Sequence, residues 1–100
     1  MATLYITEFD GRAQGVNGHV AAAYMQPAPA EQTVAIGAGS VQSAALGAST
    51  RFVRLMADAP CSVAFGANPT ATATKMRLAA NVPEVFGVVP GQKIAVITNT

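Results

Sequence analysis

Short apolar runs separated by turn residues are the feature that most restricts the fold of this chain. They recur about every 8–12 residues from residue 32 onward, with Gly, Pro, Asn and Asp in the breaks. Helical periodicity is absent, and strands at this spacing favour antiparallel architectures. The sequence therefore predicts an all-β fold: an antiparallel β-sandwich or jelly-roll-like single domain over 1–100, with a small barrel as the alternative. The predicted strands lie at 2–7, 32–36, 40–46, 50–57, 61–65, 75–79, 84–88 and 93–98.

The segment 8–31 breaks this pattern. An irregular stretch of this length is uncommon inside a compact domain and is often functional. We expect an irregular N-terminal arm that lies on a neighbour, or a long loop over its own sheet, beside a β-sandwich core at 32–100. Three consecutive alanines leave a short helix at 19–25 as an alternative. The turn-forming residues of the segment are Gly11, Gly15, Gly18, Pro27 and Pro29.

Charged residues are scarce in this chain. They make up 11% of its 100 residues, against about 25% in an average soluble domain. Hydrophobic residues make up 51%, and the formal net charge is only +1. Depletion of charge is typical of the centres of protein interfaces. We therefore expect faces of this protein to be buried against other subunits; a surface of small neutral side chains without a partner is the alternative.

Nucleic acid and membranes are not expected partners. The six basic residues are spread along the chain and mixed with five acids, so they form no basic stripe. Residues 1–9 lack the basic and apolar regions of a signal peptide, and no apolar run approaches the ~20 residues that span a bilayer. The single cysteine, Cys61, excludes an internal disulfide and suits a reducing cytoplasm.

The residues capable of catalysis do not form a convergent set. Cys61 alternates with Val63 and Phe65, which predicts a buried core cysteine. The only histidine, His19, lies in the irregular segment, so neither a Cys–His nucleophile nor a four-ligand zinc site can be assembled. The segment 37–39 lacks the third glycine of a dinucleotide fingerprint and is expected to be a turn. We predict no catalytic, cofactor-binding or metal-binding residue, no cofactor and no enzymatic activity.

Two groups of charged residues allow competing interpretations. Glu8 and Asp10 lie two apart, as a glycosidase pair could, but the chain has no Trp to stack on a sugar, and a solvated strand end is favoured. Arg54 shares its predicted strand face with Phe52 and Met56, and a charge on an apolar face needs a partner. A carboxylate across an interface, an internal salt bridge and a strand-edge position all remain open for this arginine.

The order of residues in the C-terminal two thirds of the chain resembles a known family. Over residues 33–98 it is similar to the small head decoration, or capsid cement, proteins of tailed bacteriophages. The likeness is one of overall pattern, since these families have no short diagnostic motif, and 8–31 has no counterpart in it. The segments that carry the resemblance are RFVRL at 51–55, CSVAFG at 61–66, NPTAT at 68–72, MRLAA at 76–80, EVFGV at 84–88 and PGQKIAVI at 90–97.

The resemblance implies a jelly-roll-like β-sandwich protomer on the outside of a phage capsid. Such a protein would be made in the host bacterial cytoplasm and located in the virion. Its partners would be the major capsid protein, whose lattice it would stabilise, and further copies of itself in a homodimer or homotrimer. The resemblance implies no catalytic residue. A minor tail, neck or fibre-anchoring virion protein and a ligand- or carbohydrate-binding β-sandwich module are the alternatives.

Overall fold

The computed structural model describes residues 2–14, 20–24 and 27–100, and every regular element in these ranges is a strand. The all-β class expected from the sequence is therefore confirmed. The strands are β1 (Ala2–Phe9), β2 (Arg12–Gln14), β3 (Val20–Tyr24), β4 (Ala30–Ile36), β5 (Val41–Gln42), β6 (Phe52–Ala57), β7 (Cys61–Gly66), β8 (Met76–Leu78), β9 (Glu84–Gly87) and β10 (Lys93–Thr98).

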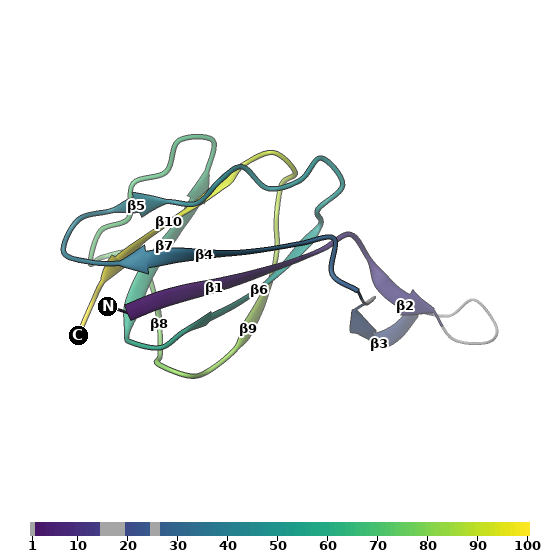
Figure 1. Cartoon of the computed structure of the whole chain (residues 1–100), viewed down its shortest axis with the longest axis horizontal. Helices are drawn as coiled ribbons and strands as arrows, with labels where there is room; N and C mark the ends of the chain where they lie inside the picture. The colour runs from purple at the N-terminus through teal and green to yellow at the C-terminus, as the bar shows by residue number, and fades with distance from the viewer. Residues whose placement is uncertain (1, 15–19, 25–26) are drawn as a thin grey trace.

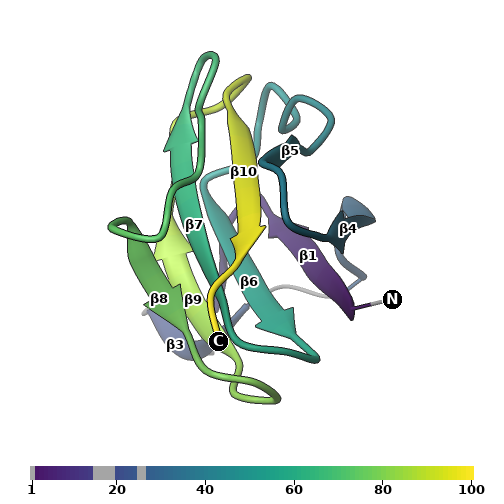
Figure 2. The same cartoon turned by 90° about the vertical axis from the view of Figure 1, so that its left-hand side faces the viewer.

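Eight of the strands form two four-stranded sheets whose paired strands are all antiparallel. One sheet has the order β4-β1-β6-β9 and the other β5-β10-β7-β8. The two layers are visible in Figures 1 and 2, where β1 and β6 belong to one layer and β7 and β10 to the other. This arrangement is compatible with a β-sandwich, and it places both chain ends at the same end of the molecule (Figure 1).

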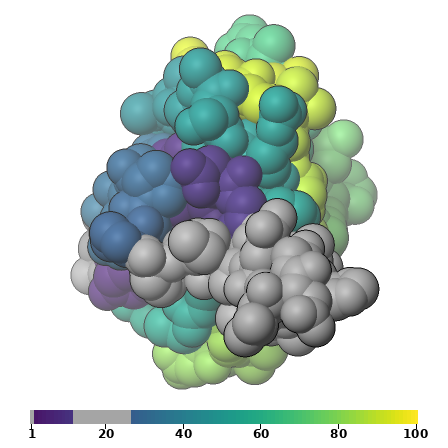
Figure 3. Space-filling view, turned by 90° about the vertical axis from the view of Figure 1, so that its right-hand side faces the viewer, coloured from purple at the N-terminus to yellow at the C-terminus, as the bar shows by residue number. Residues whose placement is uncertain are grey.

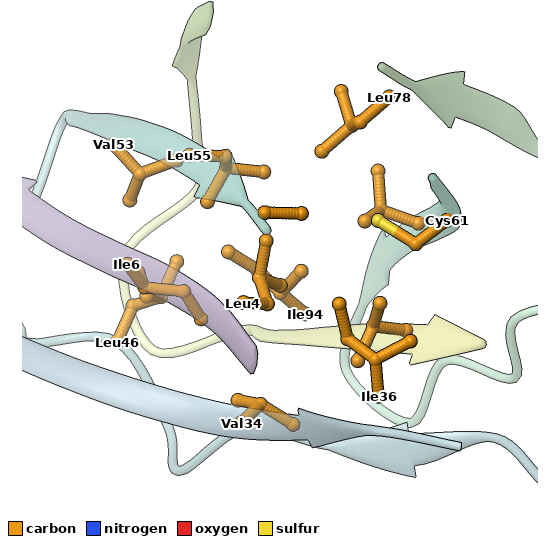
Figure 4. Close-up of a cluster of buried hydrophobic side chains, with 13 residues drawn as sticks. Leu4, Ile6, Val34, Ile36, Leu46, Val53, Leu55, Cys61, Leu78 and Ile94 are labelled. Atoms are coloured by element: carbon orange, nitrogen blue, oxygen red, sulfur yellow. The ribbon is translucent and has the colours of Figure 1, made fainter. Parts of the chain in front are cut away.

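A single apolar core lies between the two sheets. Alternate residues of β1 and β6 point inward and meet alternate residues of β7 and β10, as the side chains in Figure 4 show. A strand pattern with period two is the direct cause, since it gives each sheet one apolar face. The most deeply buried large side chains include Leu4, Ile6, Val53, Leu55, Val63, Leu78, Ile94 and Val96, each with at most 2% of its surface exposed.

All eight predicted strands are present, but the one at 40–46 is much shorter than expected. Only Val41 and Gln42 pair with β10 as a strand. Beyond them the chain stays beside β10 through single hydrogen bonds: the Ser43 amide donates to the Ile94 carbonyl at 2.7 Å, and the Leu46 amide donates to the Gln92 carbonyl at 2.7 Å. The sequence therefore located this strand correctly and overestimated its length.

The expectation of an irregular segment over 8–31 was wrong in its described part. β1 continues to Phe9 and β4 begins at Ala30, with Glu8 opposite Ala30. Between them β2 and β3 pair antiparallel with each other and with neither sheet; we call them the β2–β3 ribbon. It projects from the end opposite to both termini (Figure 1). The glycines and prolines misled the prediction because Gly11, Pro27 and Pro29 fall between strands rather than within them.

The alternative of a short helix at 19–25 is also wrong where the chain is described. Residues 20–24 form strand β3, although three of them are alanines. Helix propensity is a weak local preference, and cross-strand hydrogen bonds to β2 override it here. His19 and Met25 lie outside the described residues.

Truncation of a central core side chain is expected to cost much more than truncation of its neighbour. Leu55→Ala should lower the free energy of unfolding by about 2–5 kcal/mol, because Leu55 is 0% exposed and the cavity cannot refill from solvent. Met56→Ala, one residue on and on the outer face, should cost about 1 kcal/mol or less. Urea unfolding followed by circular dichroism measures both, and equal losses would contradict the assigned strand faces.

Candidate functional site

The outer face of the β5-β10-β7-β8 sheet is covered by the chain itself. The loop 67–75 is tied to this sheet, because the Gln42 side-chain amide donates to the Pro69 carbonyl and to Asn68 Oδ1, both at 2.8 Å. At the other end of the loop, Asn99 donates to the Ala73 carbonyl at 3.2 Å and to Ser62 Oγ at 2.7 Å. Ser62 is 0% exposed although its side chain points away from the core. This face is therefore closed to a partner over much of its area.

The outer face of the β4-β1-β6-β9 sheet is exposed at Tyr5, Glu31, Thr33 and Val85, and we call this part the open face. It stops short of the last residue of β1, because Phe9, opposite Phe52, is only 3% exposed. Its side chains come from alternate positions of four strands, and several are apolar. Tyr5 is 44% exposed and Val85 is 42% exposed. The open face comprises Thr3, Tyr5, Thr7, Glu31, Thr33, Arg54, Met56 and Val85.

The strand register orders these side chains in rows across the sheet. In one row Tyr5 lies between Thr33 and Met56. In the next row Thr7 lies between Glu31 and Arg54. Residues directly opposite each other in an antiparallel pair share a face and are close enough to interact. The open face therefore has an uncharged row, with Tyr5 at its centre, beside a row with one acid and one base.

The structure narrows the interpretation of Arg54. It shares the outer face with Phe52 and Met56, as its sequence position predicted. Its strand lies between β1 and β9, so the strand-edge explanation is wrong. The side chain of Arg54 makes no ion pair or hydrogen bond with any other described residue, and neither does the side chain of Glu31. An internal salt bridge is thus absent from the described part of the chain, and a carboxylate across an interface stays a prediction.

A shallow hollow lies on the open face where β1 and β4 adjoin. Tyr5, Thr7, Glu31 and Thr33 line it, and its volume is about 260 Å³. Pockets that enclose a small molecule have volumes of roughly 300–1,000 Å³ and bury most of their ligand. This hollow is smaller than that and open to solvent. It is a shallow depression in the open face and not a separate ligand pocket.

Glu8 is not the solvated strand-end residue that its sequence position favoured. It is 3% exposed and points inward, where its Oε1 accepts hydrogen bonds from the Thr50 hydroxyl at 2.7 Å and from the Gly47 amide at 2.9 Å. The Gln32 side-chain amide approaches its other oxygen at 3.4 Å. Asp10 is exposed, so the two carboxylates do not form a catalytic pair.

The role of Glu8 is to hold the loop 43–51 against the end of β1. A Cβ on Gly47 would lie 3.0 Å from Thr50 Oγ1, so the loop can come this close because Gly47 has no side chain. The donors are 39 and 42 residues away in sequence. No local pattern could have revealed them, apart from the presence of a glutamate at an inward strand position.

Removal of the Glu8 carboxylate should destabilise the fold. Glu8→Ala is expected to lower the free energy of unfolding by about 1–3 kcal/mol, because the Thr50 hydroxyl and the Gly47 amide lose a buried acceptor. Glu31→Ala removes an exposed carboxylate from the next strand and should change it by about 0.5 kcal/mol or less. Urea titrations of both variants make the comparison, and an equal effect would show that the buried network is dispensable.

Cys61 lies in the core, as predicted. Its side chain is 0% exposed and belongs to the apolar cluster between the sheets (Figure 4). Burial raises the pKa of the Cys61 thiol above its ordinary value, and the charge of Arg77 lowers it by a smaller amount. A raised pKa means a smaller thiolate fraction at any given pH, and the thiolate is the nucleophilic form. The environment of this cysteine therefore opposes a catalytic role.

The Cys61 thiol should be unreactive until the protein unfolds. In native protein at pH 8, Ellman's reagent is expected to modify it at least roughly 100-fold more slowly than in guanidinium, because the thiol is inaccessible and protonated. Absorbance at the released thionitrobenzoate band measures both rates. Rapid modification of native protein without loss of its circular dichroism would contradict this burial.

Among the described residues, the remaining sequence candidates do not come together as a chemical site. No group of three His, Cys, Asp or Glu residues among those described could hold a metal ion, and His19 lies outside them. The glycines of 37–39 connect β4 to the two-residue strand β5 instead of opening a helix, so the turn interpretation is confirmed. In the ranges that the structure covers, no helix is long and apolar enough to cross a membrane.

The end of the molecule from which the β2–β3 ribbon projects is shown in Figure 3. There the last part of β1, in purple, lies between the start of β4, in blue, and the teal segment that precedes β6. The ribbon follows β1 after only Asp10 and Gly11.

Comparison with known proteins identifies no relative. No protein-family model, curated protein or solved structure matches the chain.

Proposed function

We propose that this protein is a structural subunit that stabilises a phage capsid by binding to its outside, as head decoration proteins do. The observation that carries the proposal is the asymmetry of the body: one sheet face is covered by the chain's own loop, while the other is open and a two-stranded ribbon extends beyond it. A body of this kind offers surfaces to partners. The described residues offer no converging catalytic group.

The distribution of charge supports an assembly role. Only 11% of the residues are charged and the net charge is +1, so electrostatic repulsion between this protein and other subunits is weak. Each contact of a small subunit is weak, but many contacts on one lattice act together and give high avidity. An assembled shell presents such a lattice, whereas a soluble small-molecule ligand does not.

The connections between strands support a jelly-roll form of the sandwich. Going from β4 to β10, the chain changes sheet at every connection except the one from β7 to β8. Eight strands in two antiparallel sheets with such crossovers are typical of jelly rolls, which occur in viral capsid proteins and in lectins. We infer a jelly-roll protomer in which β1, from the start of the chain, supplies one inner strand beside β4.

The proposed partners are the major capsid protein and further copies of this chain. The β2–β3 ribbon is suited to the capsid, because a strand with free backbone groups can add to the edge of a neighbour's sheet. It pairs with neither sheet of its own body. A minor tail or neck position is the second candidate, and copy number distinguishes the two: a lattice protein is present in many copies over the whole shell, whereas a tail or neck protein is present in few copies at one vertex.

Replacement of the ribbon should uncouple folding from capsid binding. Glu8 lies opposite Ala30, so Phe9 and Pro29 come next in register and a two-residue Asn-Gly turn can replace 10–28. This variant should keep the circular dichroism spectrum of a β protein and lose at least roughly tenfold in binding to shells that lack the protein, because the capsid-facing strands are gone.

Cosedimentation with purified shells measures this binding, and electron cryomicroscopy of decorated shells counts the copies. The variant Lys75→Glu, in the loop over the other sheet, serves as the control and should bind like the unchanged protein. A folded ribbon variant that binds shells normally would refute the role of the ribbon. Failure of the unchanged protein to bind any shell, with hits on a glycan array, would favour a carbohydrate-binding module instead.

A further inference from the structure

The row of Glu31, Thr7 and Arg54 has the symmetry needed for self-association. Thr7 lies on β1, and the acid and the base flank it on β4 and β6, one strand spacing to either side. Two strand spacings place their backbones about 10 Å apart. Neither charge has a partner among the described residues. The face therefore presents one unpaired charge of each sign at equal distances from its central strand.

We propose that the open face binds the open face of a second copy across a two-fold axis that runs parallel to β1 above Thr7. Rotation about this axis exchanges the strands that flank β1, so Glu31 of each copy lies over Arg54 of the other. A two-fold interface requires such a self-complementary patch, in which residue i meets j and j meets i. The inference rests on the proposed assembly function and names the copy-to-copy contact within it.

The same axis also organises the apolar row. Tyr5 lies on β1 between Thr33 and Met56, so the rotation places the two Tyr5 rings beside each other on the axis. Each Met56 then lies over a Thr33 of the other copy. Tyrosine and methionine are enriched in interface centres, and Tyr5 is 44% exposed in the single chain. The apolar contact supplies attraction, and the charged row supplies the alignment.

The two charges also disfavour dimers in which the two-fold axis lies above a strand next to β1. If the axis lay above β6, Arg54 would meet Arg54 of the second copy, and above β4 Glu31 would meet Glu31. Like charges placed together across an interface are costly and disfavour the wrong register. Only the axis above β1 pairs opposite charges on both sides. An aligned packing of two sheets about 10 Å apart can accommodate these side chains.

The proposed dimer has a defined polarity. Because the axis runs along β1, both β2–β3 ribbons project from one end of the dimer and both pairs of termini lie at the other. One sheet face contributes fewer than the roughly 20–30 residues per side of a standard interface. We therefore expect a weak dimer whose population rises with concentration, with a dissociation constant of roughly micromolar order.

Sedimentation velocity of the purified full chain, from about 1 to 300 μM, tests the proposal without any capsid. The unchanged protein should shift from monomer to dimer over this range. Arg54→Glu and Glu31→Arg should each raise the dissociation constant by roughly tenfold or more, because each places like charges together twice per dimer. The double variant carrying both changes should recover the dimer, since the pairs are restored with reversed signs.

Lys75→Glu, the same charge change on the covered side of the molecule, should leave the dissociation constant unchanged. Circular dichroism confirms that each variant is folded. A chain that stays monomeric throughout, single reversals without effect, or a double variant that is not rescued would each overturn the proposal. Binding to shells is measured separately: a monomer that binds shells refutes this inference and leaves the capsid function standing, whereas a dimer that binds none refutes the capsid function alone.

Discussion

The apolar contact between the inner faces of the two sheets is the interaction on which the rest of the structure depends. Each sheet has four strands and one apolar face, which must be buried against another layer, so neither layer would be stable alone in water. The long inner strands β1, β6, β7 and β10 supply most of the buried side chains. Burial of these faces fixes the register of the strands that line the core, because a shift by one residue would turn the apolar set toward solvent.

The two outer faces differ because of one loop. The residues 67–75 lie between β7 and β8 and are hydrogen-bonded over their own sheet, which removes that face from the protein's exposed surface. The opposite sheet lacks an equivalent segment among the described residues. The inner strand β1 therefore presents Tyr5 between the uncharged Thr33 and Met56, and Thr7 between the charged Glu31 and Arg54. A body with one covered and one exposed sheet face suits a subunit that binds its partners through the exposed face.

Two of the few carboxylates of this chain have opposite environments. One carboxylate, that of Glu8, is used inside the body to hold the loop 43–51, and its hydrogen bonds to Thr50 and Gly47 satisfy it without a cation. Another, Glu31, is left outside with no described partner. A buried carboxylate that accepts several hydrogen bonds contributes to the shape of the fold. An unpaired one opposite an unpaired arginine contributes to recognition.

The sequence by itself determined the fold class and the position of all eight sheet strands, because period-two burial and turn residues are local properties of the chain. It also placed Cys61 in the core and Arg54 on the face of Phe52 and Met56. Only the tertiary structure decided that Glu8 is buried, that β2 and β3 form a ribbon, and which sheet face is open. Each of these depends on contacts between residues distant in the chain, and strand order and loop placement leave no mark in local periodicity.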